Sequence, residues 1–169
     1  MSANLNLSVT AEARFAVEVA KYPTEQRQSA VMACLAIVQQ EQGFVSAEAE
    51  LQVAAYLDMP PIAVHEVTTF YNMYNQQAVG RYKFNVCTNL PCQLRDGQKA
   101  LEHLCLRLGV EPGGTSADGL FTVQMSECLG ACADSPVMLV NDRQMCSNMD
   151  NARLDDLLAT LRSHATVKA

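Results

Sequence analysis

The chain has 169 residues, of which 49% are hydrophobic, and a formal net charge of −6 at pH 7. This length suits one ordinary domain or a compact domain with a helical extension, and the lack of a long uncharged apolar run argues against a membrane-spanning protein. The acidic balance also argues against a nucleic-acid partner, because phosphate binding needs clustered lysines and arginines.

Residues 1–10 contain no basic residue and no apolar block, so they match neither a secretory signal nor a transit peptide. We expect a short disordered tail there and a cytoplasmic protein. In a reducing cytosol the seven cysteines are better explained by metal binding or thiol chemistry than by disulfides.

Residues 1–79 are predicted to form an N-terminal helical region of about four helices. Apolar residues recur at helical spacing within 27–42, and a glycine follows as a stop. A serine at position 46 is expected to begin a helix that ends at 57, and a proline pair to open another that runs from 61 to about 71. The aromatic segment 70–74 fits either a partner interface or a core.

The pattern changes near Gly80, so residues 80–169 are predicted to form a second, α/β domain. In chain order the expected elements are a strand at 81–86, a helix at 98–108, short strands at 120–125 and 137–140, and a terminal helix through 161. We expect the two short strands to pair as a hairpin. This order, with a cysteine-containing loop after the first strand, is compatible with a thioredoxin-like domain.

Four cysteines form two pairs in loops that follow predicted strands. Four residues separate Cys87 from Cys92, and three separate Cys128 from Cys132. Thiolate ligands concentrate negative charge, so their site needs free backbone N–H donors and loops that curve around it. Gly130 keeps a bulky side chain away from the second pair. The pattern fits a [2Fe-2S] cluster held by these four cysteines.

An all-cysteine zinc site is the main alternative, because four thiolates in two pairs also make a closed tetrahedral site. The wider spacings favour two irons bridged by sulfide, but spacing alone leaves both metals open. Dithiol redox catalysis is disfavoured, since it typically uses a C-x-x-C pair. Cys34 and Cys105 fall in apolar helical stripes and are expected to pack in the core. Packing is also favoured for Cys146 in a short strand, with a spare ligand role as the alternative.

Neither a histidine site nor a nucleotide site is predicted. His65, His103 and His164 lie on predicted helices without partners at helical spacing, so we expect them at the surface or at its boundary. No G-x-G-x-x-G or Walker-type loop occurs in the sequence. We therefore expect no substrate site in this chain, and any NADH or flavin would bind elsewhere.

Four segments together resemble one known family, the small thioredoxin-like [2Fe-2S] subunit of respiratory NADH:quinone oxidoreductase, or complex I. The segments are Glu66–Tyr74, Val79–Tyr82, Val86–Cys92 and Glu127–Cys132. The resemblance implies an N-terminal helical region followed by a thioredoxin-like [2Fe-2S] ferredoxin domain. It also implies one cluster ligated by Cys87, Cys92, Cys128 and Cys132, which places iron ahead of zinc.

The same resemblance implies a function and a partner. The chain would be a non-catalytic, one-electron carrier subunit of the oxidoreductase. Its partner would be a flavoprotein subunit that binds NADH and FMN, in the peripheral arm of a membrane-associated complex. The corresponding subunit of an NAD-linked hydrogenase or formate dehydrogenase is the alternative within electron transfer.

Overall fold

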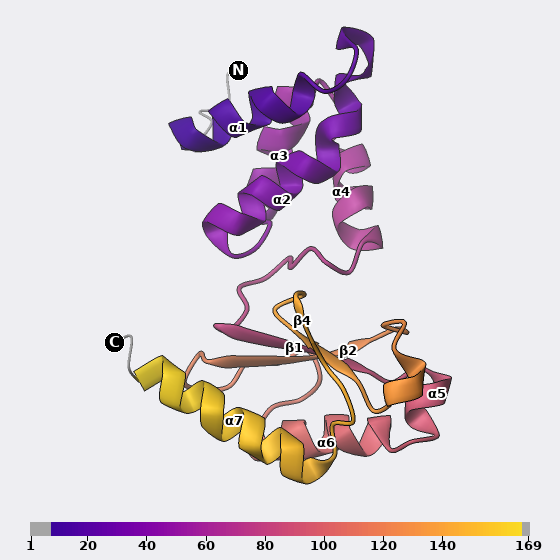
Figure 1. Cartoon of the computed structure of the whole chain (residues 1–169). Helices are drawn as coiled ribbons and strands as arrows, with labels where there is room; N and C mark the ends of the chain where they lie inside the picture. Colours follow the sequence, from indigo (N-terminus) through magenta and orange to yellow (C-terminus); the bar gives the residue numbers. More distant parts are fainter. Residues whose placement is uncertain (1–7, 167–169) are drawn as a thin grey trace. The chain divides into compact units, whose positions relative to one another are not determined.

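The computed structural model describes residues 8–166, and the chain divides into two compact units between Ala78 and Val79. The first unit is helical (Figure 1). Its elements are α1 (Val9–Val19), a 3₁₀ helix η1 (Thr24–Ala30), α2 (Val31–Gln42), α3 (Ala47–Leu57) and α4 (Pro61–Phe70). None of the helices within residues 8–166 combines the length and apolar character that crossing a bilayer requires.

Capping residues explain where these helices begin and end. Ser8 caps α1 by accepting a hydrogen bond from the Ala11 N–H at 3.0 Å, so the disorder predicted for residues 8–10 is wrong, while residues 1–7 lie outside the described residues. Ser46 caps α3 in the same way, as predicted. Gly43 ends α2 with a left-handed φ of 83°, as predicted, but α2 begins later than expected because a 3₁₀ helix precedes it.

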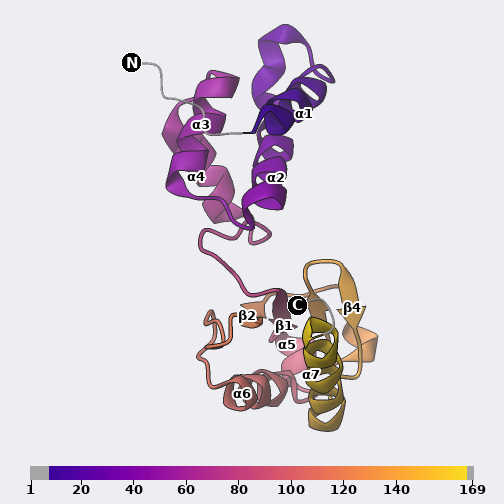
Figure 2. The same ribbon diagram turned by 90° about the vertical axis from the view of Figure 1, so that its left-hand side faces the viewer.

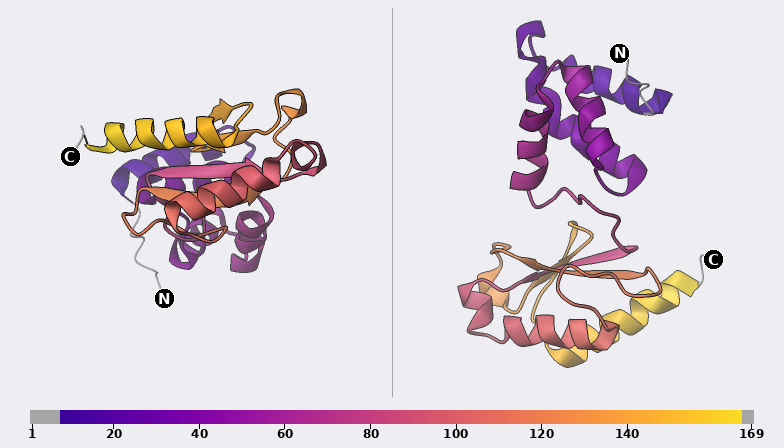
Figure 3. Two further views of the ribbon diagram at one scale, coloured as in Figure 1. Left: turned by 90° about the horizontal axis from the view of Figure 1, so that it is seen from below. Right: turned by 180° about the vertical axis from the view of Figure 1, so that it is seen from behind.

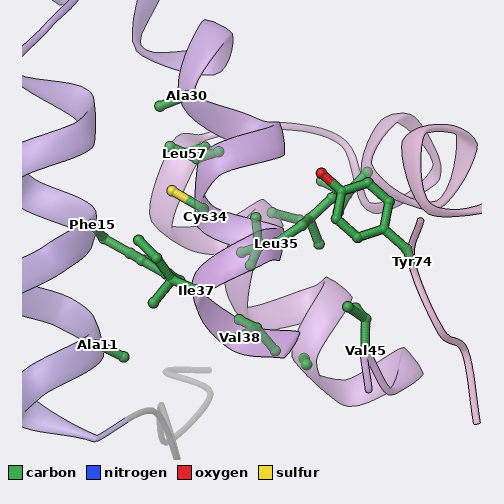
Figure 4. Close-up of a cluster of buried hydrophobic side chains, with 14 residues drawn as sticks. Ala11, Phe15, Ala30, Cys34, Leu35, Ile37, Val38, Val45, Leu57 and Tyr74 are labelled. Carbon is green, nitrogen blue, oxygen red and sulfur yellow. The ribbon is translucent and has the colours of Figure 1, made fainter. Parts of the chain in front are cut away.

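The aromatic segment at the end of α4 is divided between core and surface. Tyr74 is only 6% exposed, and its hydroxyl donates to the carbonyl of Met32 at 2.9 Å. Figure 4 shows Tyr74 among the buried side chains of this unit, near Leu35, and Cys34 belongs to the same core. Phe70, in contrast, is 79% exposed. Tyr74 is therefore a core residue of the helical unit.

The second unit contains a four-stranded sheet with the order β2-β1-β3-β4. Its elements are β1 (Tyr82–Cys87), α5 (Leu90–Gln93), α6 (Gly97–Leu108), β2 (Phe121–Ser126), a 3₁₀ helix η2 (Cys132–Asp134), β3 (Met138–Val140), β4 (Gln144–Cys146) and α7 (Asn151–Thr166). β1 pairs with β2 in parallel and with β3 antiparallel. The predicted hairpin of β2 with β3 is wrong, because β1 lies between them and β3 forms its hairpin with β4.

Helices α6 and α7 cover the same face of this sheet (Figures 1, 2 and 3). Alternate residues of β1, Phe84 and Val86, are buried in the core beneath them together with Leu104 of α6. Asp155 of α7 joins the two helices by accepting from the Arg107 Nε at 2.8 Å, with His103 Nε2 3.0 Å away. This helical layer covers one face of β1, and the loops that carry the cysteines follow at the carboxyl end of the strand.

Candidate metal centre

The strand order brings both cysteine pairs to the carboxyl end of β1. In the parallel pairing Cys87, the last residue of β1, lies opposite Ser126, the last residue of β2. β3 begins at Met138 on the other side of β1 and runs in the opposite direction. The segment 127–137 must therefore cross over the end of β1, and Figure 1 shows it in orange at the same end of the sheet as α5. The Cys87 N–H donates to the carbonyl of Val137 within this crossing segment at 3.1 Å.

The first loop folds into a short helix that buries its second cysteine. The Asn89 side chain caps α5 by accepting from the Leu90 N–H at 3.0 Å. Proline follows at the start of this helix, where its missing N–H costs nothing. Cys87 and Cys92 are both 1% exposed. Water is thus kept away from the two thiols of this pair.

Gly97 lets α6 pack directly against the first loop. A Cβ added at this position would lie 2.8 Å from the carbonyl oxygen of Cys92 and 2.9 Å from that of Cys87. Both contacts are with backbone atoms, which cannot rotate away as a side chain can. The first residue of α6 therefore has to be glycine for the two cysteines to hold their positions.

The second loop carries a more open pair. Cys128 is exposed and Cys132, at the start of η2, is partly buried. Their sulfurs are 3.5 Å apart, and the Gly130 N–H points at the Cys128 Sγ at 3.4 Å. Gly130 has a φ of 80°, which glycine adopts without strain, so the loop can turn its amide towards sulfur.

Side-chain hydrogen bonds hold the two loops against each other. They connect Asn89 Nδ2 with Glu127 Oε2 at 2.8 Å, Arg95 Nη1 with the carbonyl of Ala133 at 2.9 Å, and Ser135 Oγ with Cys92 Sγ at 3.2 Å. Each bond joins a residue of segment 88–95 to a residue of the crossing segment. The relative position of the two cysteine pairs is therefore fixed by the protein itself.

Backbone amides of the crossing segment face the cysteine sulfurs of the first pair. The Leu129 N–H donates to Cys87, at the end of β1, and the Val137 N–H donates to Cys92. Such N–H groups stabilise sulfur when it carries negative charge. The donor set thus fits thiolate ligands of a metal centre.

The pKa values of the cysteines reflect burial and mutual repulsion. Burial raises the pKa of Cys87. Burial also acts to raise the pKa of Cys92, but hydrogen bonds, chiefly from Ser135, outweigh it and hold that pKa below its ordinary value. The pKa of Cys132 is raised, first by its hydrogen bond with Cys128 and in part by the charges of Cys92 and Cys87. A cationic metal centre would relieve this repulsion among the four thiolates.

The four sulfurs are arranged as two pairs. Cys87 is hydrogen-bonded to Cys92, and Cys128 lies next to Cys132. Two irons that each take two thiolates match this pairwise arrangement. The residues present therefore fit a binuclear cluster.

The remaining cysteines and histidines lie elsewhere, as predicted. Cys34 is fully buried in the core of the helical unit, while Cys105 and Cys146 are partly buried against the core of the second unit. His65 lies 2.9 Å from the carboxylate of Glu50 in the first unit. His103 pairs with Asp155 as described above, and His164 is exposed on α7.

Two residues that shape the site were missed in the sequence. Ser135 follows Cys132 by three residues, but nothing in the local pattern indicated that its hydroxyl would reach Cys92. Gly97 stands at the start of a predicted helix. A glycine at such a position can indicate that another part of the backbone comes close, and here the carbonyl groups of Cys87 and Cys92 do so.

Comparison with known proteins gives the family. Residues 15–162 match the family model described as "Thioredoxin-like [2Fe-2S] ferredoxin". The chain is 40% identical over 144 residues to "NADH-quinone oxidoreductase subunit 2" of Thermus thermophilus, a match that covers 85% of this chain and 80% of that protein. It is likewise 40% identical over 144 residues to an NADH-quinone oxidoreductase subunit of Rhizobium meliloti, covering 85% of this chain and 84% of that protein.

A solved structure supports the fold. Its description is "Crystal structure of NAD+-reducing [NiFe]-hydrogenase in the air-oxidized state", and the TM-score is 0.68 at 23% identity. The match covers 80% of this chain but only 23% of the hydrogenase chain, so the likeness concerns the fold alone. The predicted combination of a helical region and a thioredoxin-like domain is confirmed by these matches, and the chain belongs to the thioredoxin-like [2Fe-2S] ferredoxins.

Proposed function

We propose that the chain is a one-electron carrier subunit of an NADH:quinone oxidoreductase, with one [2Fe-2S] cluster held by Cys87, Cys92, Cys128 and Cys132. The main support for this proposal is that segment 127–137 crosses over the end of β1. This crossing places the second cysteine pair near the first, where backbone N–H groups can donate to sulfur. Relatives that are 40% identical carry the names of such subunits. We assign the cluster to residues 80–169 and regard residues 1–79 as a separate helical region.

The contribution of this chain is to hold, shield and orient the redox centre. A bound [2Fe-2S] cluster accepts and releases one electron without breaking a substrate bond. Burial of Cys87 and Cys92 excludes water from one side of the site, and the exposed Cys128 leaves the other side open. Backbone amides such as those of Leu129 and Gly130 stabilise the negative charge on sulfur.

The proposed partner is a flavoprotein subunit that binds NADH and exchanges electrons with this chain through its FMN. Leu90 and Leu94, at α5 beside Cys92, are 62% and 77% exposed, and apolar side chains beside a redox site suit a protein contact. This partner would also supply the substrate site, and we place the assembly in the peripheral arm of a membrane-associated complex on the cytoplasmic side.

The test is a visible and EPR spectrum of anaerobically purified protein before and after dithionite, with iron, zinc and acid-labile sulfide counted in the same sample. Two irons and two sulfides per chain, with an EPR signal that appears only on reduction, are expected. One zinc without sulfide would refute the electron-carrier proposal. Co-purification of an FMN-containing, NADH-oxidising subunit from the native source tests the partner, and purification of the complex without any flavoprotein would refute that part.

A further inference from the structure

Ser135 is a buried polar side chain that touches a residue of each cysteine pair. It is 4% exposed and lies in the crossing segment between η2 and β3. Its Oγ donates to the carbonyl oxygen of Cys132 at 2.7 Å and lies 3.2 Å from the Sγ of Cys92, a contact in which either atom can be the donor. Because a buried hydroxyl is excluded from bulk water, these two protein atoms decide where its proton points.

The Ser135 hydroxyl has two possible acceptors at this contact, the Cys132 carbonyl oxygen and the Sγ of Cys92. A serine hydroxyl has one proton to donate, and the Cys132 carbonyl can only accept. A Cys92 thiolate bound to iron has no proton, so it becomes a second acceptor that competes for the hydroxyl proton of Ser135.

We propose that Ser135 is a positioning residue that raises the reduction potential of the cluster by donating its hydroxyl proton to the Sγ of Cys92. This inference rests on the proposed function, because it requires Cys92 to be a cluster ligand. The residue acts through the ligand sulfur. On reduction one electron passes from the external reductant to the cluster, the Ser135 proton stays on Oγ, and no covalent bond forms or breaks.

The direction of the effect follows from charge. The added electron increases the negative charge carried by the cluster and its thiolates, and hydrogen bonds to charged acceptors are stronger than those to neutral ones. The bond from Ser135 to Cys92 is therefore stronger in the reduced state than in the oxidised state, while the competing carbonyl of Cys132 stays neutral. Burial strengthens this difference, because little water is available to screen it.

Ser135 differs in kind from the other donors to the site. The amides of Leu129 and Val137 are backbone groups that the fold supplies whatever the side chain is. The Ser135 hydroxyl is a side-chain donor, so a different residue at this one position can change the potential without moving a loop. The backbone of Ser135 has φ −59° and ψ 147°, an extended conformation that other residues adopt without strain before a proline.

The test compares the reduction midpoint of three cluster-loaded proteins: the wild type, Ser135→Ala and Ser135→Thr. Each is titrated anaerobically at one pH with EPR detection, and iron and sulfide are counted in every sample. We expect the Ser135→Ala protein to retain the cluster and to have a lower reduction midpoint than the wild type. The expected change is about tenfold in the ratio of oxidised to reduced cluster at a given potential, which corresponds to about 59 mV for one electron. The Thr variant keeps the hydroxyl and should restore the midpoint to that of the wild type.

Ser116→Ala is the matched control. Ser116 is also a buried serine of the second unit, at 7% exposed, and its hydroxyl donates to Asp118 rather than to a cysteine. Its replacement should lower the melting temperature without changing the midpoint. A change in stability alone would thus be separated from a change in potential.

Each outcome decides the inference. A Ser135→Ala protein with two irons per chain and a midpoint equal to that of the wild type overturns it. If Ser135→Ala loses iron, the Ser135→Thr and Ser135→Val proteins are compared instead, because threonine and valine have the same shape and differ by the hydroxyl. A lower midpoint in the Ser135→Val protein supports the inference. Equal midpoints in the two proteins overturn it. A wild-type protein without iron and sulfide refutes instead the proposed function on which the inference rests.

Discussion

Replacing Gly97 by alanine tests whether the start of α6 holds the cysteine loop in place. The new Cβ would lie 2.8 Å from the Cys92 carbonyl oxygen, whereas ordinary contact begins near 3.4 Å, so backbone must move by about 0.6 Å. Functional constellations tolerate displacements of about 0.5 Å. This overpacking should lower the free energy of unfolding by about 1–3 kcal/mol. The better helix propensity of alanine offsets up to about 1 kcal/mol of that loss.

The expected result is therefore a folded protein with less cluster. Iron and acid-labile sulfide per chain, measured after anaerobic purification, should fall to less than half in Gly97→Ala. Gly109→Ala, at the other end of the same helix, is the control: its φ of 66° makes alanine cost about 1–2 kcal/mol, but the added Cβ meets no atom within 4 Å. Full iron content and an unchanged EPR spectrum in Gly97→Ala would refute the argument.

Three further predictions address the cysteines and the helical layer. Cys128→Ser should lose most of its iron and sulfide, whereas Cys105→Ser should keep both and lose about 1 kcal/mol of stability; equal iron in the two variants would contradict the ligand assignment. Burial raises the pKa of Cys34 to about 12, so its thiol should resist iodoacetamide at pH 8 in the native protein and react in urea, as read by peptide mass spectrometry. The pKa of Asp155 is lowered, chiefly by its hydrogen bond with His103, so its contribution to stability is present above the unfolded-state pKa of about 4 and is lost as pH falls below it. Thermal unfolding of Asp155→Asn should consequently depend less on pH below about 4 than that of the wild type, and parallel curves would argue against this role.

Local chemistry in the sequence was enough to predict most elements. Ser46 and Gly43 mark helix ends through side-chain capping and a left-handed backbone, and both effects act within a few residues. The exclusion of Cys34 from the site followed from its place in an apolar stripe, and the structure confirms that it is buried. Two predictions were wrong because the local patterns were too short. The segment before α2 forms a 3₁₀ helix instead of the first turn of an α-helix, and a serine cap starts α1 where a disordered tail was predicted.

The pairing of strands was not predictable in the same way. Residues 120–125 and 137–140 are adjacent β-like runs, which favoured a hairpin, but β1 lies between the strands that they form. Nothing within either run encodes this, because the choice depends on which faces α6 and α7 bury and on the parallel pairing of β1 with β2. The contact of Ser135 with Cys92 is missed for the same reason, since it joins residues that only the sheet order brings together.

The corrected strand order explains why the two cysteine pairs lie at the same end of the sheet. A direct hairpin of β2 with β3 would place Cys128 and Cys132 in its own turn, with no reason for Cys87 to lie beneath them. With β1 between β2 and β3, the connection has to pass over the last residue of β1, which is Cys87. The Leu129 amide then reaches the Cys87 sulfur from the opposite loop. A change that unpairs β3 from β1 should therefore release the crossing segment and reduce cluster content even if all four cysteines remain.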